Sequence, residues 1–431
     1  MTNSDTKNFS QNVSSSYHLE DKCKCNKNTC ANARNVPKLR FKGYNDEWKK
    51  VKLKDICIDF IVPMRDKPKE FNGNIPWCRI EDIDGNYFNG TKSNKYVSQE
   101  TIDKMNLKII PTGSVICSCS ASLGTYAINT CPIITNQTFI GLVCSEKISN
   151  HFLLNLMNTQ TRKLKIIAGG TTIPYISREK FEEYNIKIPS LPEQEKIASF
   201  LTLIDKKIEK QKKLVVLLKK YKRGLLSAIF NQKLRFKDDN DNDYSAWEEK
   251  RLGDICKIVG GGTPDTNNVK YWGDDINWFT PTEIIKKYAN SSNRKISRLG
   301  LLKSSAKILP IGTVLLTTRA TLGEMSILSI EATTNQGFQS LIPVKDEVSS
   351  EYIYYCQPII KHFCYKYANG STFLEISKQT LAKLKLMIPN KDEQNKISDF
   401  LSKFDDKIQQ EECKLNNLQI YKQGLLQQMF I

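Results

Sequence analysis

The side chains of this chain that are best suited to reading a nucleic acid follow short β-rich segments. An arginine can donate to two acceptors on the edge of a guanine, and serine, threonine or a carboxylate can bond to other base edges. Arg319 is the strongest single candidate, because it follows a predicted strand at 313–318 and precedes a Leu-Gly turn. A solvated or phosphate-binding arginine is the alternative interpretation. The candidate base-contacting residues are Arg79, Glu81, Asp82, Ser120, Ser122, Thr171, Thr172, Thr280, Thr282, Arg319, Thr321, Ser371 and Thr372.

Motifs for catalysis or metal binding are missing from the sequence. It contains neither a Gly-x4-Gly-Lys-Ser/Thr phosphate loop nor an Asn/Asp-Pro-Pro-aromatic tetrapeptide of the kind that amino-methyltransferases use. His18, His151 and His362 form no pair at metal or triad spacing. Cysteines 23, 25 and 30 near His18 fit no standard zinc finger, and a disordered tail is the favoured interpretation. The sequence therefore predicts no catalytic residue, no metal and no cofactor in this chain.

Composition predicts a folded protein with a polyanionic partner. Lys and Arg number 64 against 46 Asp and Glu, which gives a net charge of +18 and makes nucleic acid the default partner. The 40% of hydrophobic residues can build cores, and 431 residues suggest two or three domains. Most of the 13 cysteines lie singly in apolar runs, which is typical of reduced core thiols. No apolar stretch approaches the ~20 residues that span a bilayer, so we expect a cytoplasmic protein that does not associate with membranes.

The two halves of the chain repeat each other at an offset of 199 to 201 residues. Asp55-Ile56-Cys57 returns as residues 254–256, Thr135-Asn136-Gln137 as 334–336, and Glu193-Gln194 as 393–394. The order of the matching segments is kept throughout, which indicates an internal duplication. Each repeat begins with a segment of short strands and Gly/Pro/Asn turns that predicts an α+β module, with one clear helix at 150–167 or 350–367.

Positions that differ between the modules are better candidates for base contacts than positions that they share. Modules that read different sequences should differ at the positions where they touch bases. Arg79, Glu81 and Asp82 of the first module differ from their counterparts in the second, which are Thr280, Thr282 and Glu283, so these positions are favoured. The shared Thr-Asn-Gln segments could read adenine, but their presence in both modules favours a structural role. Glycines 260–262 could cradle a phosphate, although a turn that needs positive φ is the preferred interpretation. Thr171, Thr172, Ser371 and Thr372 fit loops near a groove or ordinary caps equally well.

A long helix with an apolar seam follows each module. The apolar residues alternate in steps of four and three, with Gln211, Lys222, Glu411 and Lys422 as polar exceptions, and this 3.5-residue period is typical of supercoiled helices. If the two seams bury each other, the helices must run antiparallel and the chain has approximate two-fold symmetry. The predicted interface residues are Ile197, Leu201, Ile204, Ile208, Val215, Leu218, Leu225, Ile397, Leu401, Phe404, Ile408, Leu415, Leu418 and Leu425.

These features resemble the specificity subunit of type I restriction-modification systems. The resemblance rests on Pro-x-Leu-Arg-Phe at 37–41, on Trp-x4-Leu-x-Asp-Ile at 48–56 and 247–255, and on Glu-Gln-x-Lys-Ile at 193–197 and 393–397. It covers residues 36–431, and the paired Glu-Gln elements at the heads of both helices are its most specific feature. Glycines 260–262 with Thr263 and Pro264 also resemble the opening of a target recognition domain of this family.

The resemblance implies a non-catalytic subunit in which two target recognition domains each read half of a split DNA sequence. The expected organisation is a disordered tail at 1–36, module 1 at 37–190, a coiled-coil helix at 191–233, module 2 at 234–390 and a second helix at 391–431. The resemblance also implies two methyltransferase (modification) subunits and motor-nuclease subunits, with S-adenosylmethionine, ATP and magnesium bound by those partners. The rival interpretations are a coiled-coil DNA-binding scaffold, a coiled-coil scaffold without nucleic-acid contact, which would need the +18 charge to lie on the coil alone, and a self-sufficient DNA-modifying enzyme.

Overall fold

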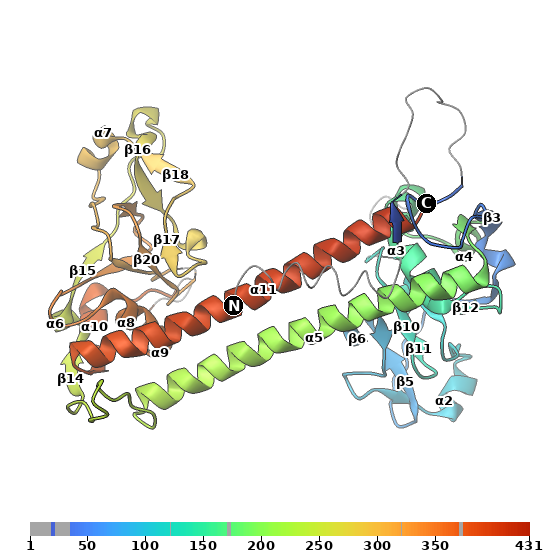
Figure 1. The fold of residues 1–431 in the computed structure, drawn as a ribbon, viewed down its shortest axis with the longest axis horizontal. Helices are drawn as coiled ribbons and strands as arrows, with labels where there is room; N and C mark the ends of the chain where they lie inside the picture. Colours follow the sequence, from blue (N-terminus) through green and yellow to red (C-terminus); the bar gives the residue numbers. More distant parts are fainter. Residues whose placement is uncertain (1–18, 22–34, 121, 170–173, 320, 370–373) are drawn as a thin grey trace. The chain divides into compact units, whose positions relative to one another are not determined.

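The computed structural model describes residues 19–21, 35–120, 122–169, 174–319, 321–369 and 374–431 (Figure 1). The chain divides into two compact units. Unit 1 takes in the described part of Met1–Leu214 together with Glu412–Ile431, and unit 2 takes in that of Val215–Glu411. Each unit therefore contains one of the repeated modules and a part of each long helix.

Unit 1 is built around a mixed sheet with the strand order β4-β12-β9-β10-β7-β6. Its strands are β4 (Cys57–Ile61), β6 (Ile83–Asp84), β7 (Tyr87–Phe88), β9 (Val115–Ser118), β10 (Tyr126–Asn129) and β12 (Phe139–Cys144). Smaller sheets contain β11 (Ile134–Thr135), β5 (Ile75–Cys78) and β8 (Tyr96–Val97), then β13 (Asn185–Ile188) and β3 (Lys49–Lys52), and finally β1 (Leu19–Asp21) and β2 (Leu39–Phe41). The short helices of the module are α2 (Gln99–Lys104), α3 (Asn150–Ile167) and α4 (Arg178–Glu182).

Unit 2 repeats this arrangement with the strand order β15-β22-β19-β20-β17. These strands are β15 (Cys256–Gly260), β17 (Tyr288–Ala289), β19 (Val314–Leu316), β20 (Met325–Leu328) and β22 (Gln339–Pro343). The smaller sheets contain β18 (Arg294–Ile296), β16 (Trp272–Phe279) and β21 (Thr333–Thr334), then β14 (Glu248–Arg251) and β23 (Lys385–Ile388). Its short helices are α6 (Leu252–Ile255), α7 (Arg298–Leu302), α8 (Ser350–Tyr355), α9 (Gln357–Tyr367) and α10 (Lys378–Ala382). The prediction of two tandem α+β modules is confirmed.

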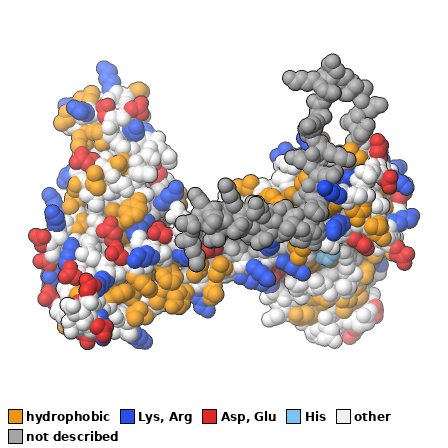
Figure 2. All heavy atoms as spheres, in the orientation of Figure 1, with side chains coloured by type: hydrophobic (Ala, Val, Ile, Leu, Met, Phe, Trp, Pro, Cys, Tyr) orange, Lys and Arg blue, Asp and Glu red, His pale blue; other side chains and the backbone are white. Residues whose placement is uncertain are grey.

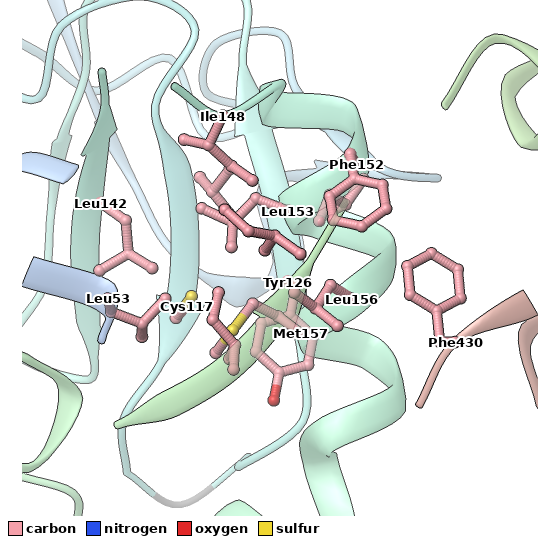
Figure 3. Close-up of a cluster of buried hydrophobic side chains, with 14 of the residues drawn as sticks. Leu53, Cys117, Tyr126, Leu142, Ile148, Phe152, Leu153, Leu156, Met157 and Phe430 are labelled. Atoms are coloured by element: carbon pink, nitrogen blue, oxygen red, sulfur yellow. The ribbon is translucent and has the colours of Figure 1, made fainter. Parts of the chain in front are cut away.

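Helix α3 has the bounds that its sequence predicts. The Ser149 hydroxyl accepts a hydrogen bond from the Phe152 amide and caps the first turn. The apolar face of the helix then packs on β9 and β10 to form the core shown in Figure 3. Leu153 is fully buried there, so truncation to alanine should cost about 2–5 kcal/mol.

The equivalent helix of module 2 is broken, so the prediction of one continuous helix over 350–367 is wrong. Helix α8 ends at Tyr355, and α9 begins at Gln357 with Pro358 in its first turn. Proline has no amide hydrogen to donate to the carbonyl four residues earlier, and its ring crowds that carbonyl. The break at Cys356 follows from this one residue, and both halves of the helix still pack on the sheet.

The two long helices are α5 (Leu191–Phe230) and α11 (Lys391–Met429). None of the fourteen predicted interface residues is exposed. In unit 1, Ile197 and Leu201 of α5 share a core with Leu425 and Met429 of α11. In unit 2, Ile397 and Leu401 of α11 share a core with Ile229 of α5. Within each unit the first turns of one helix thus pack near the last turns of the other, together with the module.

Two of the polar exceptions in the seam are lysines paired with aspartates of the opposite helix. In unit 1, Lys422 Nζ lies 2.5 Å from the Asp205 carboxylate, which also accepts a 2.8 Å hydrogen bond from the Asn86 side chain. In unit 2, Lys222 pairs with Asp405, whose carboxylate accepts a 2.9 Å hydrogen bond from the Tyr355 hydroxyl. Each aspartate therefore connects both helices and the module of its own unit. Polar groups at such positions favour one register of two helices over others.

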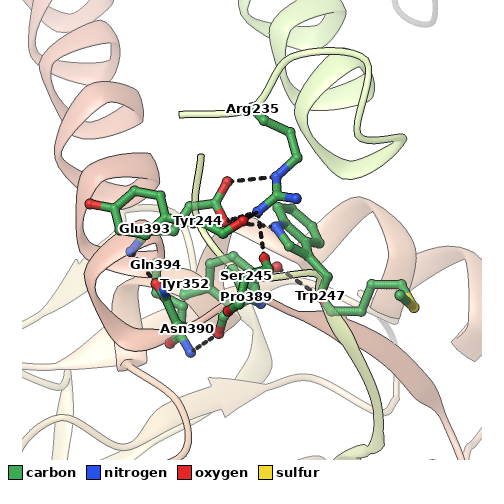
Figure 4. A network of polar contacts seen from close by, with 10 residues as sticks. Arg235, Tyr244, Ser245, Trp247, Tyr352, Pro389, Asn390, Glu393 and Gln394 are labelled. Carbon is green, nitrogen blue, oxygen red and sulfur yellow. Dashed lines mark hydrogen bonds and ion pairs between the residues drawn. The ribbon is translucent and has the colours of Figure 1, made fainter. Parts of the chain in front are cut away.

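The Glu-Gln element at the head of each long helix anchors the start of its module. In unit 2 the Arg235 Nε and Nη2 groups donate to the fully buried Glu393 carboxylate at 3.1 and 2.7 Å (Figure 4). The Trp247 indole N–H donates to the same carboxylate at 2.9 Å. In unit 1, Arg40 binds Glu193 in the same bidentate way, with both distances at 2.7 Å. The Leu-Arg-Phe and Glu-Gln motifs, more than 150 residues apart in sequence, are thus partners in space.

The glutamine of the same element binds only backbone atoms of the module. Gln194 accepts from the Ser149 amide and donates to the carbonyls of Lys147 and Pro189. Gln394 makes the equivalent bonds to the Ser349 amide and to the carbonyls of residues 347 and 389. Because every residue except proline offers the same backbone amide and carbonyl, this contact places little demand on the side chains of the module.

Candidate nucleic-acid interface

The first group of predicted contact residues lies in a short 3-10 turn, η2 (Ile80–Asp82). Arg79 and Glu81 are exposed and lie 3.2 Å apart as an ion pair. Asp82 is buried, and its two oxygens accept hydrogen bonds from the amides of Arg79 (2.7 Å) and Lys92 (2.6 Å). The geometry therefore favours a structural role for Asp82 over base contact, and leaves Arg79 and Glu81 as the accessible side chains.

Module 2 uses the same construction in the turn η4 (Pro281–Glu283). Glu283 accepts hydrogen bonds from the Thr280 amide and hydroxyl, and its other oxygen accepts from the Asn293 amide. Glu283 is thus the structural counterpart of Asp82, although the residue types differ. Thr282 is exposed, and its hydroxyl lies 3.2 Å from that of Thr280.

The second group lies in the turns that follow β9 and β19. Ser122 is exposed in module 1, and Thr321 is exposed at the equivalent position of module 2. The Thr321 hydroxyl donates to the Pro281 carbonyl at 3.4 Å, which joins this turn to η4. In module 2 the structure therefore brings Thr280, Thr282 and Thr321 into one patch.

Arg319, two residues before Thr321, has a partner that the sequence did not indicate. Its Nη2 lies 2.8 Å from the Glu375 carboxylate, and both side chains are about two-fifths exposed. The backbone of Glu375 is hydrogen-bonded to that of Asn369. The predicted contact residues Ser371, Thr372, Thr171 and Thr172 lie outside the described residues. Comparison of the two repeats could have identified Glu375, because tyrosine occupies the equivalent position 175 in module 1.

The glycine-rich segment after β15 serves packing. A side chain at Gly261 would meet the backbone of Asn335 at 2.0 Å, and one at Gly262 would meet Ser305 at 2.3 Å. Neither glycine has positive φ, so the expected turn with positive φ is wrong. Absence of a side chain, which permits close approach of the backbone, explains these glycines. The Asn335 side chain accepts from the Gly337 amide, in agreement with a structural role for the Thr-Asn-Gln segment.

The positive charge of the chain is distributed beyond the long helices. Helix α5 carries ten Lys and Arg against four Asp and Glu, and α11 carries six against seven. The two helices thus hold only +5 of the net charge of +18. Figure 2 shows lysine and arginine side chains on the surface of both units. A scaffold that carries its excess charge on the coil alone does not fit this distribution.

The described cysteines are free thiols, and most are buried. Burial raises the pKa of Cys256 and of Cys144 to about 12, so these thiols are protonated and unreactive at neutral pH. Among the described residues, no group of three or more His, Cys, Asp or Glu side chains could hold a metal ion. None of the described helices is long and apolar enough to cross a membrane.

Comparison with known proteins identifies the family. The model of the type I restriction modification DNA specificity domain matches residues 45–218 and again 244–419, one match for each repeat. The chain therefore belongs to the family of type I restriction-modification specificity proteins.

Relatives and solved structures agree with this assignment. The MjaIX specificity subunit of Methanocaldococcus jannaschii is 39% identical over 168 residues, and the EcoR124I/EcoR124II subunit of Escherichia coli is 29% identical over 165. These matches span 38% and 37% of this chain and only about two-fifths of each relative (39% and 41%). The putative MjaX subunit is 24% identical and matches 87% of this chain and 91% of its own length.

Two solved structures share the fold. The S subunit of a type I system from M. genitalium has a TM-score of 0.54 at 17% identity and covers 92% of this chain and 99% of its own. A chain from a study of complex assembly and conformational transition of the type I R-M system has a TM-score of 0.58 at 19% identity, covering 89% and 97%.

Proposed function

We propose that this chain is the non-catalytic subunit that gives a type I restriction-modification complex its DNA sequence specificity. Module 1 and module 2 each read one half of a bipartite target in double-stranded DNA. The observation that carries the proposal is the duplication of one scaffold with different accessible side chains at the same turns: exposed Arg79 and Glu81 in module 1, and half-buried Thr280 with exposed Thr282 in module 2. A protein that reads two different half-sites requires this combination of constant scaffold and variable contact residues.

The long helices α5 and α11 form, in this proposal, an antiparallel coiled coil with approximate two-fold symmetry that separates the modules. The packing of the start of each helix near the end of the other supports this arrangement. At about 1.5 Å per residue, such helices are long enough to fix the number of unread base pairs between the half-sites. Thr171, Thr172, Ser371 and Thr372 remain predicted contact residues.

The chemistry belongs to partner subunits in this proposal. Two methyltransferase subunits would supply S-adenosylmethionine-dependent methylation of adenine, and motor-nuclease subunits would use ATP and magnesium to translocate and cut DNA. This chain would bind DNA in the cytoplasm and recruit both, and would need no cofactor of its own.

Deletion of the gene for this chain tests the proposal directly. We expect one bipartite class of methylated adenine sites to disappear from the genome of the deletion strain and to return when the chain is restored. Long-read sequencing of native genomic DNA measures this. An unchanged methylome would contradict the proposal, and methylation of DNA by the purified chain alone would establish the rival interpretation of a self-sufficient enzyme.

Insertion into α5 tests the proposed role of the coil. Four residues added after Lys210 lengthen the helix by about 6 Å, while one base pair of B-DNA rises about 3.4 Å. We expect a spacer longer by one or two base pairs, unchanged half-sites and reduced activity, because the insertion also shifts the heptad phase. A methylome with the original spacer and an altered half-site would show that the coil does not measure distance.

A further inference from the structure

We propose that Glu375 is a positioning residue that holds the Arg319 guanidinium so that its free donors face one guanine in the half-site read by module 2. This inference rests on the proposed function, because it concerns how one module reads DNA. The juxtaposition that carries it is the ion pair of 2.8 Å between Arg319 Nη2 and the Glu375 carboxylate.

Both members of the pair are attached to backbone that is fixed by hydrogen bonds. On the Arg319 side, the Thr318 amide donates to the Gly337 carbonyl at 2.8 Å and the Thr321 amide donates to the Arg319 carbonyl at 2.7 Å. On the other side, Glu375 exchanges two hydrogen bonds of 2.9 Å with Asn369 and precedes the fully buried Ile376. The backbone at both residues is therefore fixed at a separation that lets the carboxylate accept from the guanidinium.

Module 1 has the same backbone arrangement with different side chains. The Cys119 amide donates to the Thr138 carbonyl at 2.8 Å, and Tyr175 exchanges two hydrogen bonds of 2.8 Å with Gly169. Ser120 stands in the place of Arg319, and its backbone forms a β-bridge with that of Tyr175, which stands in the place of Glu375. Two facing positions have therefore changed together on an unchanged scaffold.

The ion pairs that have a structural role in this protein differ from the Arg319–Glu375 pair in where they occur and in how deeply they are buried. The arginine–glutamate pairs that anchor the modules, Arg40 with Glu193 and Arg235 with Glu393, are present in both units and have a buried carboxylate. The Arg319–Glu375 pair is present in one unit only, and both side chains are partly exposed. Exposed ion pairs contribute little to the free energy of folding, so the stability of the fold does not explain why Arg319 and Glu375 are paired.

The chemistry of the pair favours a base edge over a phosphate. A guanidinium has five donors in a planar fork, and the Glu375 carboxylate lies beside one of its nitrogens, Nη2, which leaves other donors for the O6 and N7 acceptors of guanine. An arginine contact to a phosphate is strengthened by the positive charge of the guanidinium, and the Glu375 carboxylate offsets that charge and repels the phosphate. A guanidinium that is held in one orientation, and whose charge is partly neutralised by a carboxylate, is suited to hydrogen bonding with the edge of a base.

The test is the methylome of a host without other adenine methylation that expresses the full chain with its own modification subunits. In the wild type we expect guanine at one defined position of the half-site read by module 2. With Glu375→Gln or Arg319→Lys, discrimination against the other three bases at that position should fall at least tenfold, because lysine lacks the fork and glutamine lacks the charge. Every other position and the other half-site should be unchanged.

Glu249→Gln is the matched control, because Glu249 forms an exposed 2.7 Å ion pair with Lys385 in the same unit and should leave the target unaltered. A variant complex that no longer methylates is assayed instead by competition between duplexes with each of the four bases at that position. Three results would overturn the inference: a half-site without guanine, unaltered base preference in the Glu375→Gln variant, or an equal loss of affinity for all four duplexes, which indicates a phosphate contact. Failure of the proposed function would be distinct, since the wild-type chain would then direct no methylation.

Discussion

Arg235→Met is expected to lower the free energy of unfolding of unit 2 by about 3 kcal/mol, because it leaves the buried Glu393 carboxylate without its cationic partner. This loss of unfolding free energy should be at the low end of the range for breaking a buried ion pair, because Trp247 still donates to the carboxylate and Arg235 is partly exposed. Hydrogen–deuterium exchange of unit 2 peptides at increasing denaturant concentration measures this local stability.

Two further substitutions make the interpretation specific. Arg235→Met combined with Glu393→Gln should be more stable than Arg235→Met alone, because the neutral amide oxygen can still accept from Trp247 and no charge remains buried. Lys385→Met, which breaks an exposed pair in the same unit, should cost less than about 1 kcal/mol. Equal losses for Arg235→Met and Lys385→Met would show that the buried network does not anchor the module.

Unit 1 should be at least as sensitive to loss of its arginine. Glu193 is as buried as Glu393 and Arg40 is less exposed than Arg235, so the charge left behind is no better solvated. Among the described residues, the Trp48 indole N–H has no hydrogen-bond partner, so it does not donate to Glu193 as Trp247 donates to Glu393. The same measurement on Arg40→Met in peptides of unit 1 makes this comparison.

Features encoded by local periodicity were predictable from the sequence. Helix α3 has the predicted bounds because its polar cap and its apolar face lie within one short segment. The duplication was predictable because it is a comparison of the chain with itself, and the common strand order of the two units confirms it. The break at Cys356 was also predictable, because Pro358 can be read from the sequence. The periodicity of apolar positions does not show it, since that periodicity takes no account of the hydrogen bond that a proline cannot donate.

Contacts between residues far apart in sequence were not predictable in this way. The Arg-Glu anchor was visible only as two separate motifs, because nothing local indicates that residues 40 and 193 meet. Asp82 was selected as a contact residue because it differs from its counterpart, yet both residues accept the same backbone hydrogen bonds. A difference in residue type between repeats identifies a reader only when the side chain also remains accessible, as it does for Arg319.

Exchange of residues 42–187 for the module of a relative is expected to change one half of the methylated sequence and leave the other half intact. Arg40, Glu193 and Gln194 lie outside the exchanged segment, so the anchor remains that of the host chain. Gln194 bonds only to backbone atoms of residues 147, 149 and 189, so it accepts a module of any sequence with the same fold. The methylome of the hybrid, expressed with the modification subunits of the host, measures the outcome.

Aromatic residues next to the anchor are among the module 1 side chains that a donor module must match, together with Asn86, which bonds Asp205 of α5. Trp48 and Phe152 lie inside the exchanged segment, and their rings lie 6.1 and 5.3 Å from the ring of Phe430 at the end of α11. A donor module with aromatic residues at these two positions should therefore give a folded hybrid, and a donor with small residues there should leave a cavity that costs about 3–5 kcal/mol for each lost ring. A folded hybrid in which both half-sites change would contradict independent reading by the modules. If only the half-site of module 2 changed, the assignment of each half-site to its own module would be wrong, because the exchange leaves every residue of module 2 in place.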